Sequence, residues 1–223
     1  MVITETLISA VILGVSGVFG SIIYFMMNSS SKSEKKGTLE ELLSQFINLM
    51  IFIYIIKIIL NLDIFLADPM AVLAYPSDST VFYSAIVLTG LMIIYKNIKG
   101  KIDLRRYSDG LITVFLTSSM MYEFIHFIIY DDTYAFVYFI VLAVVFLVFY
   151  MFYNRVEKKN ILIIAVLLWT SAIIIISTVY GTATVFDYTM QPWFGILLAA
   201  GGILLILFAY GKIGENDKRE VER

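Results

Sequence analysis

The sequence predicts an all-α fold, a polytopic membrane helical bundle with seven transmembrane helices. Three observations predict it: an apolar composition, seven apolar stretches of membrane-spanning length, and basic residues confined to alternate loops. The 223 residues are 60% hydrophobic and 15% charged, whereas an average soluble chain is about 45–50% apolar and about 25% charged. The mean hydropathy of +0.88 agrees with a chain that lies in a membrane.

A membrane-spanning helix needs ~20 mostly apolar residues, because the hydrocarbon core is about 30 Å thick and a helix rises ~1.5 Å per residue. Because a helix satisfies its own backbone groups in lipid, these stretches predict a bundle of helices. The third stretch is the shortest and depends on a cap at Ser77 or Asp78. The seven stretches lie near residues 7–27, 42–64, 77–95, 109–130, 134–153, 161–180 and 192–210. We expect one integral membrane domain over residues 1–223, with a short cytoplasmic tail at 211–223.

The lysines and arginines outside the spans are sorted between alternate loops. They follow the first, third, fifth and seventh stretches, whereas the charged residues of the intervening loops are all acidic. Basic residues are retained on the cytoplasmic side, so we expect the N-terminus outside and the C-terminus in the cytoplasm of a prokaryotic plasma membrane. The first stretch is expected to be retained, because Glu5 and no basic residue precedes it, unlike an export signal.

Small residues share one face of the first stretch and predict close packing between helices. They are Gly14, Gly17, Gly20 and Ser21. A dimer interface or a glycine-lined path for a substrate are the alternatives.

Several kinds of chemistry are excluded by composition. The chain has no cysteine, which excludes disulfides, thiolate catalysis and metal–thiolate sites. The single histidine, His126, excludes multi-histidine metal sites, and the net charge of −2 gives no attraction to nucleic acid. The chain contains no Walker loop, no H-E-x-x-H and no G-x-S-x-G motif. We expect neither a cofactor nor a metal.

Three ionisable residues lie inside the apolar stretches: Lys57, Glu123 and His126. An unpaired charge at mid-membrane costs several kcal/mol, so such residues are candidates for a functional site. Because a helix turns by about 100° per residue, each of these ionisable residues shares its helix face with polar neighbours. Ser119 and Tyr130 lie beside Glu123 and His126, and Tyr54 and Asn61 lie beside Lys57.

Lys57 and Glu123 are each about 10 Å from the outer end of their helix. Because these depths match, we expect the two side chains to face each other in the outer half of the bundle, with His126 nearer the outside. The pair could fix helix register, or it could form a site that opens toward the outer surface. A third reading is that Lys57 extends its ammonium to the interface.

We assign the chain to no seven-helix family of this orientation. Rhodopsins carry a retinal-binding lysine in the last helix, and residues 192–210 contain none. Residues 75–110 show a faint similarity to prolipoprotein diacylglyceryl transferases, but the His-Gly-Gly element and the essential arginines of that family have no counterpart here.

Three functions fit these residues. The first is a small transporter or proton-linked permease, placed first because no nucleophile has activating neighbours. The second is a membrane enzyme acting on a lipid or lipid-linked substrate, with His126 or Glu123 as general base. The third is a non-catalytic subunit or sensor. The expected partners are membrane lipids, a small-molecule or lipid ligand, and a partner helix or second copy, with no nucleic acid.

Overall fold

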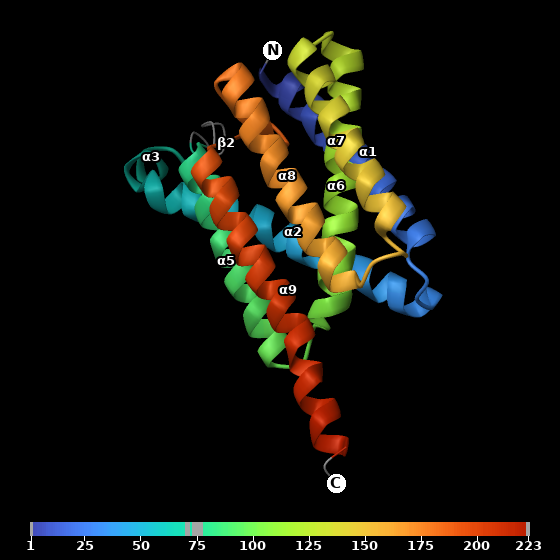
Figure 1. Ribbon diagram of the computed structural model, residues 1–223. Coiled ribbons are helices and arrows are strands. Elements are labelled where there is room, and N and C mark those ends of the chain that lie inside the picture. The colour runs from blue at the N-terminus through green and yellow to red at the C-terminus, as the bar shows by residue number, and fades with distance from the viewer. Residues whose placement is uncertain (1, 70–71, 73–77, 222–223) are drawn as a thin grey trace.

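The computed structural model describes residues 2–69, 72 and 78–221 and is a bundle of long helices (Figure 1). Within this part of the chain, seven helices are long and apolar enough to cross a membrane, which confirms the all-α class. The chain is therefore a multi-pass integral membrane protein. These helices are α1 (Val2–Met27), α2 (Lys32–Leu60), α5 (Ser79–Ile98), α6 (Leu104–Tyr130), α7 (Thr133–Phe152), α8 (Lys158–Tyr180) and α9 (Pro192–Val221). A short helix α3 (Leu62–Ala67) and a hairpin of β1 (Ala183–Val185) and β2 (Tyr188–Met190) complete the described elements.

Several helices begin earlier than hydropathy predicts, and in α2 and α6 polar caps extend the helix beyond its apolar part. Helix α2 begins at Lys32 rather than near residue 42, since Ser31 and Glu34 form a reciprocal capping box. Helix α6 begins at Leu104 rather than 109, since the Asp103 carboxylate accepts from the first backbone amides. At the other end of the chain, α9 continues as helix to Val221, through most of the predicted tail.

The connections alternate between two ends of the bundle (Figure 1). The basic end holds the turns at residues 28–31, 99–103 and 153–157 together with the C-terminus, and its loops carry lysines and arginines. The acidic end holds the N-terminus, the connection after α2, the turn at residues 131–132 and the hairpin. These two names are used below.

Helix α6 lies at the centre of the bundle and packs against α1, α2, α7, α8 and α9.

Helices α1 and α6 approach each other closely at Gly20 of α1. A Cβ atom at this position would lie 2.7 Å from the backbone oxygen of Val114 and would collide with the Ser118 side chain. At Gly14 and Gly17 an added Cβ would meet nothing within 4 Å. Close packing by small residues therefore holds at Gly20 alone among these three glycines.

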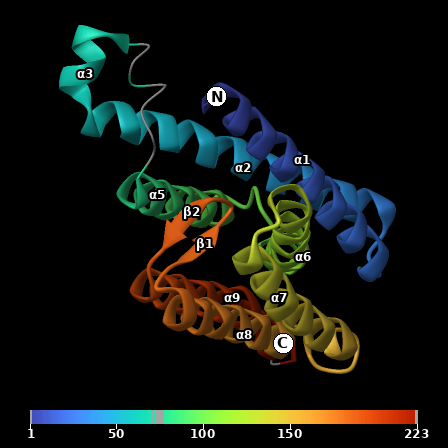
Figure 2. The ribbon, with the colours of Figure 1, turned by 90° about the horizontal axis from the view of Figure 1, so that it is seen from above.

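Helix α2 crosses the bundle obliquely (Figures 1 and 2). It begins beside α1 and α6 at the basic end and reaches α5 and α3 at the acidic end. The tilt of a spanning helix is set by its packing against neighbours, and the main partner of α2 is α5. The second half of α2 is thereby directed away from the acidic end of α6.

The segment between α8 and α9 forms an antiparallel hairpin instead of a plain connector. Seen from above, it lies among α5, α6 and α8 (Figure 2). Val185 pairs with Tyr188, and the two turn residues Phe186 and Asp187 have φ angles of 51° and 68°. Two successive positive φ angles match the right-handed twist of a two-residue hairpin, although Asn-Gly or Asp-Gly is the usual sequence.

The turn of the hairpin points into the bundle. The Phe186 ring meets the rings of Tyr122 and Phe115 edge to face, with centroids 5.4 and 5.9 Å away. Phe115 lies about 22 Å of helix axis before Tyr130, the last residue of α6, at ~1.5 Å per residue. The hairpin is therefore re-entrant, and its tip approaches the middle of α6.

The close approach of α1 and α6 predicts that Gly20→Ala destabilises the protein. Overpacking of this kind costs about 1–3 kcal/mol, although alanine is otherwise favoured over glycine in a helix by up to about 1 kcal/mol. Thermal unfolding in one detergent measures the effect, with Gly17→Ala as the matched control. A Gly20→Ala protein as stable as Gly17→Ala would contradict the packing.

Candidate functional site

Glu123 is a buried carboxylate on the inward face of α6, with 4% of its surface exposed. It forms no hydrogen bond and no ion pair within 4.0 Å with any residue that the structure describes. The charged groups that act on it most strongly are two further carboxylates, Asp187 and Asp132. Glu123 therefore lies in the apolar interior close to charges of its own sign.

His126 follows one turn after Glu123 and lies between the same two aspartates. Its Nδ1 is 3.8 Å from an Asp132 oxygen, and its Nε2 is 4.0 Å from an Asp187 oxygen. Its ring lies against Tyr130, with centroids 4.6 Å apart. Glu123, His126, Asp132 and Asp187 form what we call the acidic-end cluster. Among the described residues, no group of acids and histidine is arranged to hold a metal ion.

Local structure fixes both aspartates of the cluster. Asp132 is the N-cap of α7 and accepts from the Tyr134 amide at 2.9 Å. Asp187 is held by the hairpin, which is tied to two helices. On the α7 side, the Thr184 amide donates to the Tyr134 hydroxyl at 2.7 Å. On the α5 side, the Tyr83 hydroxyl donates to the Thr189 oxygen at 3.1 Å.

The α5 side also binds the residue that follows β2. The Tyr83 hydroxyl accepts from the Gln191 amide at 2.8 Å, and the Ser79 hydroxyl donates to the Thr189 oxygen at 3.1 Å. Tyr188 stacks on Phe82 with ring centroids 4.2 Å apart. Non-helical backbone at membrane depth is tolerated where protein groups satisfy it, and these tyrosine and serine hydroxyls do so for the hairpin.

The polar residues that were expected on α2 do not join this cluster. Tyr54 is 50% exposed on the outside of the bundle, and the Asn61 amide donates to the Lys57 backbone oxygen at 2.9 Å. Lys57 is buried, with 4% exposed. Among the ion pairs that join described residues, none connects Lys57 to Glu123. The expected ion pair is thus not formed in this structure, in which the oblique course of α2 takes that helix toward α5 and α3 at the acidic end.

The residues that were expected on α6 lie near one another. Ser119 is buried one turn below Glu123, and its hydroxyl has no partner among the described residues. Tyr130 is partly exposed and covers one side of the His126 ring. The acidic-end cluster therefore consists of the α6 half of the expected set, joined by Asp132 and by Asp187.

A second buried carboxylate, Asp109, lies at the basic end and was not singled out by the sequence. It is 6% exposed and accepts hydrogen bonds from the Asn28 amide at 2.6 Å and the Tyr153 hydroxyl at 2.8 Å. The Lys158 ammonium is 4.0 Å from its other oxygen and lies over the Tyr153 ring. Burial and the nearby Asp109 charge raise the pKa of Tyr153, which keeps its hydroxyl protonated as a donor.

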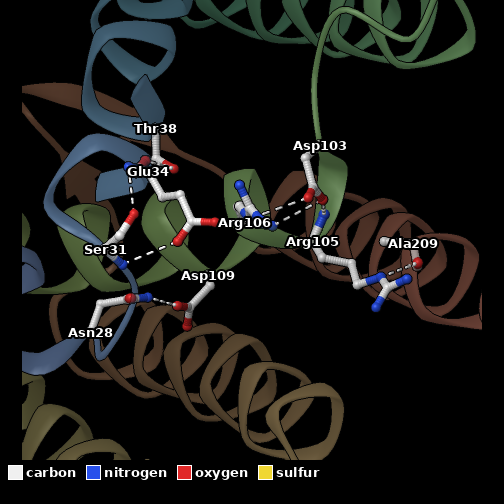
Figure 3. A network of polar contacts seen from close by, with 9 residues as sticks. All are labelled: Asn28, Ser31, Glu34, Thr38, Asp103, Arg105, Arg106, Asp109 and Ala209. Carbon is white, nitrogen blue, oxygen red and sulfur yellow. Dashed lines mark hydrogen bonds and ion pairs between the residues drawn. The ribbon is translucent and has the colours of Figure 1, made fainter. Parts of the chain in front are cut away.

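Figure 3 shows the hydrogen bond between Asn28 and Asp109 together with the neighbouring polar contacts of α2, α6 and α9 at the basic end. Arg106 lies three residues before Asp109 on α6, and it pairs with Glu34 of α2 at 2.7 Å and with Asp103 at 3.4 Å. Arg105 points the other way and donates to the Ala209 oxygen of α9 at 3.2 Å. These contacts join the start of α6 to α2 and α9, and they leave Asp109 to Asn28, Tyr153 and Lys158.

The two buried carboxylates share one face of α6. Asp109 and Glu123 are separated by about 21 Å along the axis and by about 40° around it, at ~1.5 Å and about 100° per residue. Buried hydroxyls lie between them at Thr113 and Ser119, and neither has a partner for its oxygen among the described residues. Helix α6 thus carries polar groups from one end of the bundle to the other.

Comparison with protein-family models, with curated proteins and with solved structures finds no match.

The ties between the hairpin and α5 predict that Tyr83→Phe lowers stability by about 1–3 kcal/mol, because the Gln191 amide loses its acceptor and the Thr189 oxygen loses one of its two donors. Thermal unfolding in detergent measures the loss. Tyr150→Phe is the control, since Tyr150 is exposed on α7. Equal unfolding temperatures for the two variants would contradict the role of Tyr83.

The separation of Lys57 from Glu123 predicts that Lys57→Met and Glu123→Gln act independently on stability. Their effects should add within about 0.3–0.5 kcal/mol, as they do for residues without shared partners. A double-mutant cycle in one detergent measures the coupling. A coupling energy of ~1 kcal/mol or more would show that the two side chains interact after all.

Proposed function

We propose that the protein is a proton-linked transporter of a small solute, and that Glu123 is the side chain that carries the proton. The observation that supports this most directly is the environment of Glu123. It is a carboxylate with 4% exposure, next to Asp132 and Asp187, with no hydrogen bond or ion pair to any described residue.

An isolated charged carboxylate is costly in an apolar interior, unless a proton or a cation neutralises it. Neutralisation by a fixed basic side chain would make Glu123 a structural residue. Instead, the groups around it are His126, two aspartates and tyrosines. A carboxylate in this position is suited to alternate between a protonated form in the closed interior and an ionised form when it is exposed to water.

His126 is suited to connect Glu123 with water at the acidic end. Its side chain is 24% exposed, and those of Asp132 and Asp187 are 37% and 49% exposed. An imidazole can accept a proton on one nitrogen while it donates from the other, and each nitrogen of His126 faces one aspartate. Protons that reach the aspartates can therefore pass to His126, one helical turn from Glu123.

The direction of coupling follows from the expected orientation. With the basic end in the cytoplasm, the acidic-end cluster faces outside and takes up protons there. An inward proton gradient would then drive uptake of the solute.

Proteoliposomes test this proposal. A pH-sensitive dye inside the vesicles records proton entry under an imposed potential, while amino acids, sugars and organic cations are added one at a time outside. The wild type is expected to carry protons with at least one of these solutes. Glu123→Gln should lower that flux by about 100-fold or more, because the amide cannot take up the proton.

Glu40→Gln is the matched control, since Glu40 is an exposed residue of α2 that pairs with Lys36. Its flux should equal that of the wild type. The proposal is wrong if Glu123→Gln carries protons as fast as the wild type, or if no solute in the panel raises wild-type proton entry above that of empty vesicles.

A further inference from the structure

A surface hollow opens at the basic end beside Asp109. It has a volume of about 370 Å³ and is lined by Glu157, Lys158, Lys159 and Tyr210. Lys158 is the residue that joins the hollow to the buried network, because its ammonium also lies 4.0 Å from Asp109 and over the Tyr153 ring. Water in the hollow can therefore reach the cation that neutralises Asp109.

The contact between Lys158 and Asp109 is loose compared with the other contacts of this carboxylate. Its hydrogen bonds from Asn28 and Tyr153 are 2.6 and 2.8 Å long, whereas the ammonium is at the 4.0 Å limit of an ion pair. The Lys158 side chain is 36% exposed, and that of Asp109 is 8% exposed. The cation can thus turn toward the hollow, while the carboxylate stays buried between Asn28 and Tyr153.

The other titratable groups around Asp109 are tyrosines. The Asp109 charge acts on three of them, namely Tyr24 of α1, Tyr153 after α7 and Tyr210 of α9. On the α2 side, the charges of Glu34 and Arg106 neutralise each other at 2.7 Å. Among the described residues, Lys158 is therefore the one basic group with a close contact to Asp109.

We propose that Asp109 is a second proton-binding site, at the basic end, and that Lys158 is its exchangeable counter-ion. This inference rests on the proposed proton-linked transport. When the Asp109 carboxylate takes a proton from a hydronium ion in the water of the hollow, one O–H bond breaks and another forms, and the Lys158 ammonium turns to that water. When the ammonium returns, the carboxyl group releases its proton to that water. Glu123 and Asp109 thus bind protons at opposite ends of one face of α6.

A hydrophobic carbodiimide tests the site without knowledge of the solute, because it reacts with protonated carboxyl groups in apolar surroundings. Mass spectrometry then measures labelling of Asp109 and Glu123 in the same sample of purified, lipid-reconstituted protein. Lys158→Met should speed labelling of Asp109 by about tenfold or more at a fixed pH, because it removes a positive charge at 4.0 Å. Lys159→Met, in the same hollow, should label Asp109 at the wild-type rate.

A transport measurement separates a proton site from a purely structural role. With the solute found in the flux assay, Asp109→Asn should exchange solute across the membrane at nearly the wild-type rate but lose uptake driven by a proton gradient. A structural role would reduce both rates together. Glu40→Gln changes an exposed residue of α2 that lies outside this site, so it should retain both exchange and gradient-driven uptake.

Three outcomes would overturn the inference. They are Asp109 labelling that does not change in Lys158→Met, Asp109 labelling that is absent in every variant, and loss of exchange together with uptake in a folded Asp109→Asn protein. Failure of the proposed function looks different. In that case Glu123→Gln leaves proton flux intact. The labelling of Asp109 in Lys158→Met does not depend on transport, so it still reports on the Asp109 site.

Discussion

The exclusion of water from the hydrocarbon core is the constraint on which the rest of the structure depends. Every polar group placed there must find its partner inside the protein. Helix α6 meets this constraint by lying at the centre, where its acids and hydroxyls are shielded from lipid by five neighbouring helices. The hairpin meets it through hydroxyl groups of Tyr83 and Tyr134, which bond its backbone from α5 and α7. Of the two buried carboxylates on α6, Asp109 has such partners among the described residues and Glu123 has none, which directs attention to Glu123 for function.

The hairpin contains a backbone conformation that is unfavourable for its residue, at Phe186, next to the candidate site. A bulky residue with a positive φ is disfavoured by roughly 1–2 kcal/mol, and Phe186 has a φ of 51°. The contacts of its ring with Phe115 and Tyr122 offset this cost. The same turn places Asp187 beside His126. Strained backbone is frequent where a side chain must be held for function, so the strain agrees with a role for the acidic-end cluster.

Hydropathy and helical periodicity predict the seven spans and place Ser119 and Glu123 on one face, and in the structure both residues are buried in α6. Matched depth is not enough to pair residues on different helices, because the tilt of α2 is decided by packing and not by its own sequence. The hairpin is missed because its turn, Phe186-Asp187, lacks the glycine that normally marks one. The burial of Asp109 is equally hidden, since an aspartate near a helix start is usually a solvated cap.

The two anchors of the hairpin have a mechanical consequence. One strand is bonded to Tyr134 at the start of α7 and the other to Tyr83 at the start of α5, while the strands are bonded to each other. The hairpin thus acts as a strap between two helices that belong to different sides of the bundle. A sliding or rocking movement between α5 and α7 cannot leave it in place. Such a movement would displace Asp187 from His126 and change the electrostatic potential at Glu123. A relative motion of α5 and α7 is therefore coupled to the electrostatics of the bundle interior.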